Sequence, residues 1–96
     1  MVVGTCELTL RLPENHSLKG KRQVSRSLIQ RLRNRFNVSV AEVCDQDHWQ
    51  TLSLGVCYVS DDARHANEVL SKVIGFVGDQ DGNAILERHR IEILRT

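Results

Sequence analysis

Alternation of hydrophobic and polar positions predicts four β-strands in this chain. In the first run, apolar side chains occupy every second position from Cys6 to Leu12, and polar side chains fall between them. This period is typical of a strand with one buried and one polar face. Three further short runs, rich in β-branched residues or alternating in the same way, also read as strands. The predicted strands cover residues 2–12, 38–44, 52–59 and 84–94.

Two other stretches have the spacing of amphipathic helices. The first runs from Ser17, a good N-cap, to Phe36. Its apolar stripe is Val24, Leu28, Leu32 and Phe36, with Leu18 and Ile29 beside it. The second follows the capping segment 60–62 and ends at the turn-forming residues 78–83. Its predicted core face is Ala63, Ala66, Val69, Leu70, Val73, Ile74 and Val77.

The resulting order, β-α-β-β-α-β, predicts an α+β domain of the ferredoxin-like class. Such a domain has a four-stranded antiparallel sheet with two helices on one face. The 96 residues are enough for one such domain, spanning 1–96. The other face of the sheet is then left open. It is predicted to carry mixed, mostly polar side chains, without an aromatic ring on the first or third strand.

The distribution of charge adds to this prediction, because the first predicted helix carries more than half of the positively charged residues. The stretch 17–36 holds seven of the thirteen Lys and Arg residues and no acidic residue. The net charge of the chain is +1, so the remainder sums to −6. On a helical wheel, four of the cations fall within about 60° of one another, away from the apolar stripe. These four are Lys19, Arg22, Arg26 and Arg33; Lys21, Arg31 and Arg35 flank the stripe and are expected to reach outward.

Two interpretations of this basic face compete. A solvated helix face usually mixes both signs of charge, whereas Arg22 and Arg26 stand four residues apart with no acid nearby. Uncompensated positive charge favours a polyanionic partner, and RNA is the leading candidate. Because the open sheet face lacks rings for base stacking, RNA is expected to contact the helix through its phosphates. The predicted nucleic-acid-binding residues are Lys19, Lys21, Arg22, Arg26 and Arg33.

Trp49 is the single tryptophan, and it stands in a polar segment, DHWQ (47–50). It is a candidate anchor for a partner or for a stacked base. The alternative is that the indole folds back onto a helix end or a sheet edge.

No catalytic constellation is found in the sequence. The loop after the first strand contains Pro13 and Glu14 and no glycine, so it is a poor cradle for a phosphate. The four histidines and three cysteines lack metal-ligand spacing. Residues 79–83 begin like a calcium loop, but Arg90 stands where the twelfth ligand belongs, so they are read as a turn. We therefore expect no enzyme activity, no metal and no cofactor.

No apolar run approaches the ~20 residues of a membrane span, and the N-terminus lacks the features of a signal peptide. A cytoplasmic protein without membrane contact is expected.

Several segments together resemble a known bacterial family, the YlxP-like family, whose function is uncharacterised. These segments are SLKGKR (17–22), RLRNRFNVSVAEV (31–43), DHWQ (47–50), LG (54–55) and VS (59–60). The resemblance implies a ferredoxin-like fold. It also implies a link to ribosomal RNA, since such genes are often found near genes for translation initiation and ribosome maturation. It transfers no catalytic residue.

Two alternatives to RNA binding remain open at this point. One is a homodimeric protein-interaction module that uses the open sheet face or Trp49. The other is a regulatory domain that binds a small molecule.

Overall fold

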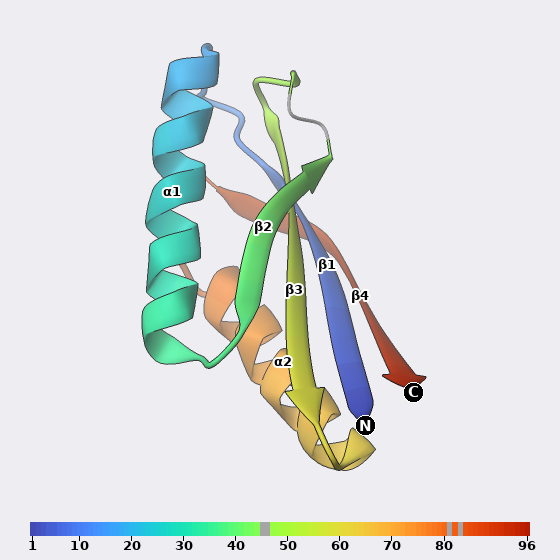
Figure 1. The fold of residues 1–96 in the computed structure, drawn as a ribbon. Coiled ribbons are helices and arrows are strands. Elements are labelled where there is room, and N and C mark those ends of the chain that lie inside the picture. The colour runs from blue at the N-terminus through green and yellow to red at the C-terminus, as the bar shows by residue number, and fades with distance from the viewer. Residues whose placement is uncertain (45–46, 81, 83) are drawn as a thin grey trace.

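The six predicted elements are all present, in the predicted order. The computed structural model describes residues 1–44, 47–80, 82 and 84–96. Residues 45, 46, 81 and 83, which belong to the two predicted turns, lie outside the described residues. The elements are β1 (Val2–Arg11), α1 (Leu18–Arg35), β2 (Ser39–Cys44), β3 (Thr51–Ser60), α2 (Ala63–Gly78) and β4 (Ile85–Arg95) (Figure 1). The ferredoxin-like fold is thereby confirmed.

The four strands form one antiparallel sheet in the order β2-β3-β1-β4, with the two termini side by side at one end (Figure 1). In the central pair, Leu8 lies opposite Leu54 and Leu10 opposite Leu52. These leucines share one face of the sheet because side chains alternate along a strand. The outer strands β2 and β4 are the edges.

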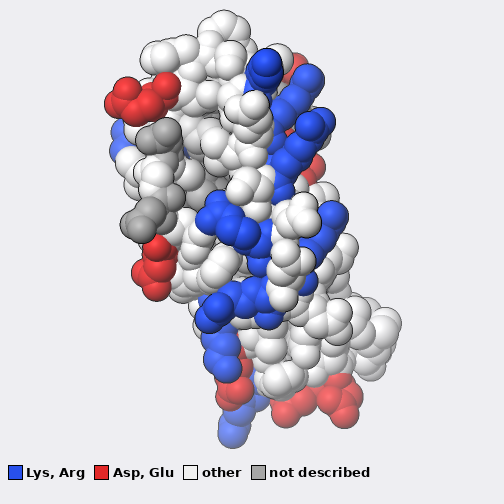
Figure 2. All heavy atoms as spheres, turned by 90° about the vertical axis from the view of Figure 1, so that its left-hand side faces the viewer, with Lys and Arg blue, Asp and Glu red and all other residues white. Residues whose placement is uncertain are grey.

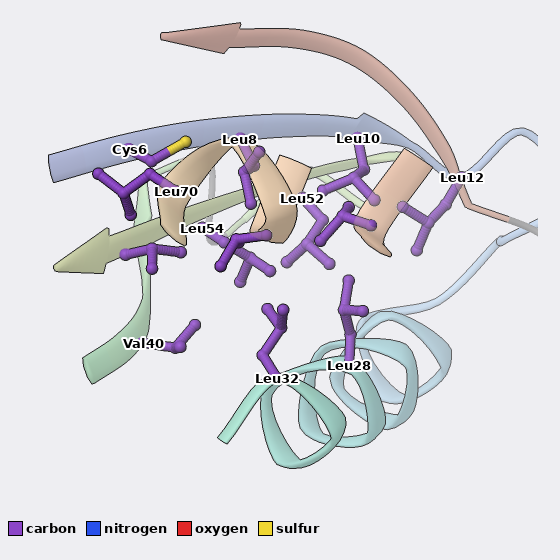
Figure 3. Packing of buried hydrophobic residues seen from close by; sticks show 13 residues of the cluster. Cys6, Leu8, Leu10, Leu12, Leu28, Leu32, Val40, Leu52, Leu54 and Leu70 are labelled. Atoms are coloured by element: carbon purple, nitrogen blue, oxygen red, sulfur yellow. The ribbon is translucent and has the colours of Figure 1, made fainter. Parts of the chain in front are cut away.

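The core lies between that leucine-rich face and both helices (Figure 3). Leu28 and Leu32 of α1 point toward the sheet, and Leu70 of α2 completes the layer. The helices therefore cover one face, as predicted, and the other face stays open. Neither helix in the described part of the chain is long and apolar enough to cross a membrane.

The fully buried residues of α1 differ in part from the predicted stripe. They are Lys21, Ser25, Leu28 and Leu32. Leu28 and Leu32 were predicted to be buried, whereas Val24, Ile29 and Phe36 are only partly buried against the core. The polar residues Lys21 and Ser25, which the prediction left out of the stripe, are buried with the two leucines.

Ser17 caps α1 as predicted, because its Oγ accepts a hydrogen bond from the backbone N–H of Gly20 at 3.0 Å. A glycine in the first turn costs about 1 kcal/mol of helix propensity relative to alanine. The structure shows why it is tolerated here. A Cβ atom at Gly20 would collide with Oδ1 of Asn15, whose side chain is packed against this turn.

The open face of the sheet also follows the prediction, with one exception. Ser53 is on this face opposite Thr9, yet only 3% of it is exposed. On the same face, Val43 lies so close over Gly55 that a Cβ atom there would approach Cγ1 of Val43 to 2.7 Å.

Candidate nucleic-acid interface

The exposed face of α1 carries most of the predicted binding residues. Lys19, Arg22, Arg26 and Arg33 are all exposed. They succeed one another along the outer side of the helix, over about 21 Å at 1.5 Å per residue. Figure 2 views the molecule from this side and shows Lys and Arg side chains in a band, with acidic side chains toward its margins.

Three of these cations have no internal partner in the described part of the chain. The ion pairs found there are Arg11–Glu87, Lys21–Glu42 and Arg90–Glu92, so the other cations of α1 pair with no described acid. No hydrogen bond within the described residues engages the side chains of Lys19, Arg22 or Arg26. Their charge is therefore directed only toward solvent or toward a partner.

The cations nearer the C-terminal end of α1 have internal neighbours. Arg33 donates from Nη2 to the carbonyl of Val40 at 3.0 Å, which ties α1 to the edge strand β2. Arg31 hydrogen-bonds the side chain of Gln80, and Arg35 lies over the ring of Phe76, with Cζ 5.3 Å from its centroid. Part of each of these three side chains therefore serves the fold.

A groove runs between α1 and β2, with a volume of about 530 Å³. Arg26 and Arg33 stand along it, with the amides of Gln30 and Asn34 between and beside them. Guanidinium groups present several donors in one plane, which suits contacts to phosphate oxygens. This groove is a candidate place on the basic face for such a contact.

The structure corrects the predicted site at Lys21. It was expected to reach outward, but it is 1% exposed. Its Nζ donates to the backbone carbonyl of His48 at 2.8 Å and lies 3.1 Å from Oε2 of Glu42. That oxygen makes no hydrogen bond of normal geometry within the described structure, so the contact with Lys21 is an ion pair. A side chain enclosed in this way cannot contact a phosphate, and Lys21 is removed from the interface.

A signal for this pair was present in the sequence. Inward positions in residues 38–44 alternate as Val38, Val40 and Glu42, so the strand directs an acid toward the core. A buried carboxylate needs a partner. The basic helix, which packs beside β2, was the nearest source of one (Figure 1).

The segment before α1 and the loop that carries Trp49 are joined by hydrogen bonds. Asn15 donates from Nδ2 to the carbonyls of Trp49 and Ser17. Gln50 donates from Nε2 to the carbonyls of Pro13 and Asn15, at 3.1 and 3.2 Å. These contacts place the predicted anchor at the same end of the molecule as the start of α1 (Figure 1).

Trp49 is 52% exposed. It is therefore not a core residue. The hydrogen bonds to this loop reach its backbone.

The open sheet face holds a second concavity, of about 450 Å³. Ala41, Val43 and Gly55 contribute its apolar part, and Cys44 and Cys57 also line it. Val43 is 48% exposed. The charged residues that line it are Glu7 of β1 and Arg90 and Glu92 of β4.

The described residues offer little that suits catalysis. They contain no cluster of three or more metal-ligating side chains. Burial raises the pKa of Cys6 to about 11, so this thiol is a weak nucleophile at neutral pH. One pairing was missed from the sequence: the hydroxyl of Tyr58 and Nε2 of His65 are 3.0 Å apart. The pair joins β3 to α2, which only the tertiary structure brings together.

Comparisons with known proteins agree with the resemblance in the sequence. The model of a family described as "Protein of unknown function (DUF503)" matches residues 3–90. The uncharacterized protein YlxP of Bacillus subtilis strain 168 is 34% identical over 76 residues, which is 79% of this chain and 83% of that protein. The predicted relationship to the YlxP-like family is confirmed.

Proposed function

The chain belongs to the DUF503 family, which is described as one of unknown function, and from that premise we propose that it is a non-catalytic accessory protein that binds RNA through the exposed face of α1. Ribosomal RNA is the partner that the resemblance to the YlxP-like family implies. A protein with that partner acts in the cytoplasm.

One observation carries the proposal: Lys19, Arg22 and Arg26 stand in a row without internal counter-charges in the described structure. Like charges at this spacing repel, and the folded protein bears that cost with no described carboxylate to offset it. A polyanion removes the repulsion on binding and releases its own counterions. Arg33, at the end of the row, extends the same face along the groove beside β2.

The mode of binding follows from the side chains on the open face of the sheet, where the described strands β1 and β3 present no aromatic ring. Thr5, Glu7 and Thr9 of β1 face the open side of the sheet, together with Ser53 and Cys57 of β3. Those side chains cannot stack bases as the aromatic residues of an RRM sheet do. Contacts to phosphates by the helix remain, and they position RNA without reading its sequence.

The salt dependence of RNA binding tests the proposal. A fluorescently labelled single-stranded 16-mer is titrated with the protein between 50 and 200 mM salt. Four neutralised phosphates predict a slope of log K against log salt of about −3. The double variant Arg22→Glu/Arg26→Glu is expected to lose affinity about ten-fold or more.

The matched control is Arg64→Glu/Lys72→Glu, which makes the same change in net charge on exposed positions of α2. It is expected to bind nearly as the wild type does, because only the charge near the contact matters within a Debye length. A slope near zero, or wild-type affinity in the α1 variant, contradicts the proposal. Equal losses in both variants indicate attraction by net charge alone and contradict it as well.

A ribosome-bound form is tested separately. Extract is fractionated on sucrose gradients at low and high salt, and the protein is located by immunoblot. Co-sedimentation with a ribosomal subunit at low salt and release at high salt is the expected result. Migration only at the top of the low-salt gradient argues against a ribosomal partner.

The concavity on the open sheet face favours a second candidate, a homodimer formed through that face. Val43 and Val59 are 48% and 59% exposed and belong to neighbouring strands. Sedimentation equilibrium of the wild type and of Val43→Glu tests it: a dimer that the charged variant abolishes supports this candidate. If the same concavity instead takes a small molecule, that ligand raises the melting temperature.

A further inference from the structure

Trp49 combines two properties. It is an aromatic residue that is 52% exposed, and the backbone around it is held by several hydrogen bonds. The carbonyl of Trp49 accepts from Asn15, the carbonyl of His48 accepts from Lys21 at 2.8 Å, and the carbonyl of Gln50 accepts from the backbone N–H of Leu12 at 2.8 Å. Three successive carbonyls are thus held by the segment 12–21.

This network holds the backbone around Trp49 in place before any partner arrives. An exposed aromatic residue on a free loop would lose backbone and side-chain conformational entropy on binding. Here the backbone part of that entropy has already been lost on folding. The loop therefore has the properties of a preformed binding surface.

The same network fastens the Trp49 loop to the start of α1. Asn15, which holds the Trp49 carbonyl, packs against Gly20 in the first turn of α1. Lys19 lies one residue before Gly20 and Arg22 two residues after it, and both are exposed. The row of cations thus begins at the end of α1 where the Trp49 loop lies (Figure 1).

Aromatic platforms next to a track of positive charge are how proteins hold single-stranded nucleic acid. The rings stack on bases and the cations follow the backbone. We infer that Trp49 stacks an unpaired base of a single-stranded RNA segment whose phosphates lie along Lys19, Arg22 and Arg26. This inference rests on the proposed function and narrows it, because the bases of a regular duplex are already stacked and are not available to the indole.

The chain is well suited to a direct test, since Trp49 is its single tryptophan. Tryptophan emission, excited selectively, therefore reports on this side chain alone. The probes are a single-stranded 12-mer of adenosine, a 12-bp RNA duplex and a 12-mer without bases. We expect the adenosine 12-mer to quench the emission on binding, and the other two to bind more weakly and without quenching.

Variants of Trp49 distinguish the contribution of base stacking to the affinity from that of charge. Trp49→Ala is expected to weaken binding of the single strand about ten-fold, within the range measured for base–aromatic stacking, and Trp49→Phe to restore most of the loss. The salt slope of both variants should equal that of the wild type, since no phosphate contact is removed. Val59→Ala, at another exposed apolar position, is the control that should change nothing. Circular dichroism confirms that each variant is folded.

The outcomes distinguish this inference from the proposed function. If the protein binds RNA with a slope near −3 while Trp49→Ala binds as tightly as the wild type, the stacking inference is overturned and the proposed function stands. If no probe binds, both fail. If the duplex quenches the emission as strongly as the single strand does, the assignment to an unpaired base is wrong.

Discussion

The ammonium group of Lys21 lies 3.1 Å from the carboxylate of Glu42, and the pair joins the inner side of α1 to the inner side of the edge strand β2. The Lys21 side chain is 2% exposed and that of Glu42 is 21% exposed. Nζ of Lys21 also donates to the carbonyl of His48. One lysine therefore holds together the basic helix, the edge strand and the loop that carries Trp49.

Removing one partner of this pair should destabilise the protein. We expect Lys21→Ala to lower the free energy of unfolding by about 3 kcal/mol, because the variant loses the ion pair and leaves space in the core. The double variant Lys21→Met/Glu42→Leu should recover to within about 1 kcal/mol of the wild type, since an apolar pair of similar volume avoids the desolvation cost. Urea denaturation measures both. A loss below about 0.5 kcal/mol for Lys21→Ala would show that the pair is unimportant.

The burial of Lys21 also leads to a prediction about RNA binding. Lys21→Met, where it remains folded, should leave the salt slope of RNA binding unchanged. Arg22→Gln and Arg26→Gln should each reduce the magnitude of the slope by about 0.7, the value for one phosphate on a single strand. Titrations of the three variants against the same oligonucleotide compare them. Equal reductions in all three would mean that Lys21 reaches the ligand after all.

The substitution Gly20→Ala should change the stability of the protein in opposite directions in two backgrounds. In the wild type, Gly20→Ala displaces the Asn15 side chain and breaks its hydrogen bonds to the carbonyls of Trp49 and Ser17. We expect a net loss of about 1 kcal/mol, since two hydrogen bonds outweigh the gain in helix propensity. In an Asn15→Ala background the collision is gone, and Gly20→Ala should stabilise by up to about 1 kcal/mol.

Gly75 is the matched control for that experiment, because no atom lies within 4 Å of a Cβ built there, and it is exposed on α2. Gly75→Ala should stabilise the wild type by about 1 kcal/mol. Thermal or urea unfolding of the set gives the sign in each background. The explanation fails if Gly20→Ala stabilises the wild type as much as Gly75→Ala does.

Cys6 should make stability depend on alkaline pH. Burial raises the pKa of this thiol from 9.0 to about 11; a hydrogen bond from the Arg90 backbone opposes the rise, and the Glu7 carboxylate adds to it. The folded state therefore keeps the proton after the unfolded state has lost it. Stability from this group is complete below pH 9.0 and is lost as the pH rises to about 11.

The comparison with Cys6→Ala isolates the effect. Between pH 9.0 and about 11, the free energy of unfolding should fall more steeply for the wild type than for the variant. Parallel curves would indicate a thiol with an ordinary pKa. Alkylation at pH 8 provides an independent check, since the exposed Cys44 should react before the buried Cys6.

Much of the fold could be predicted because its signals are local. Alternation from Cys6 to Leu12 identifies the buried side of β1, and Ser17 and Asp62 cap the helices where the sequence places them. Each of these patterns depends only on neighbours a few residues away. The outward direction of Lys19, Arg22 and Arg26 was predictable for the same reason, since it follows from the helical repeat alone.

Lys21 shows where local reasoning ends. The helical repeat places it on the same side as Leu28, but its burial as a charged group depends on Glu42 and on the carbonyl of His48, which are 21 and 27 residues away along the chain. The same holds for Gly20, because the packing of the Asn15 side chain against it leaves no room for a Cβ atom. It holds too for Trp49, whose backbone is fixed by residues near the first helix.

The amino-acid sequence by itself determined the order of the elements, the side of each that is apolar, and the concentration of positive charge on the first helix. Only the tertiary structure decided which cations remain free, because a charged group is buried or exposed according to the partners that folding brings to it. Periodicity records how a residue is oriented on its own element, and it contains no information on what the neighbouring element presents.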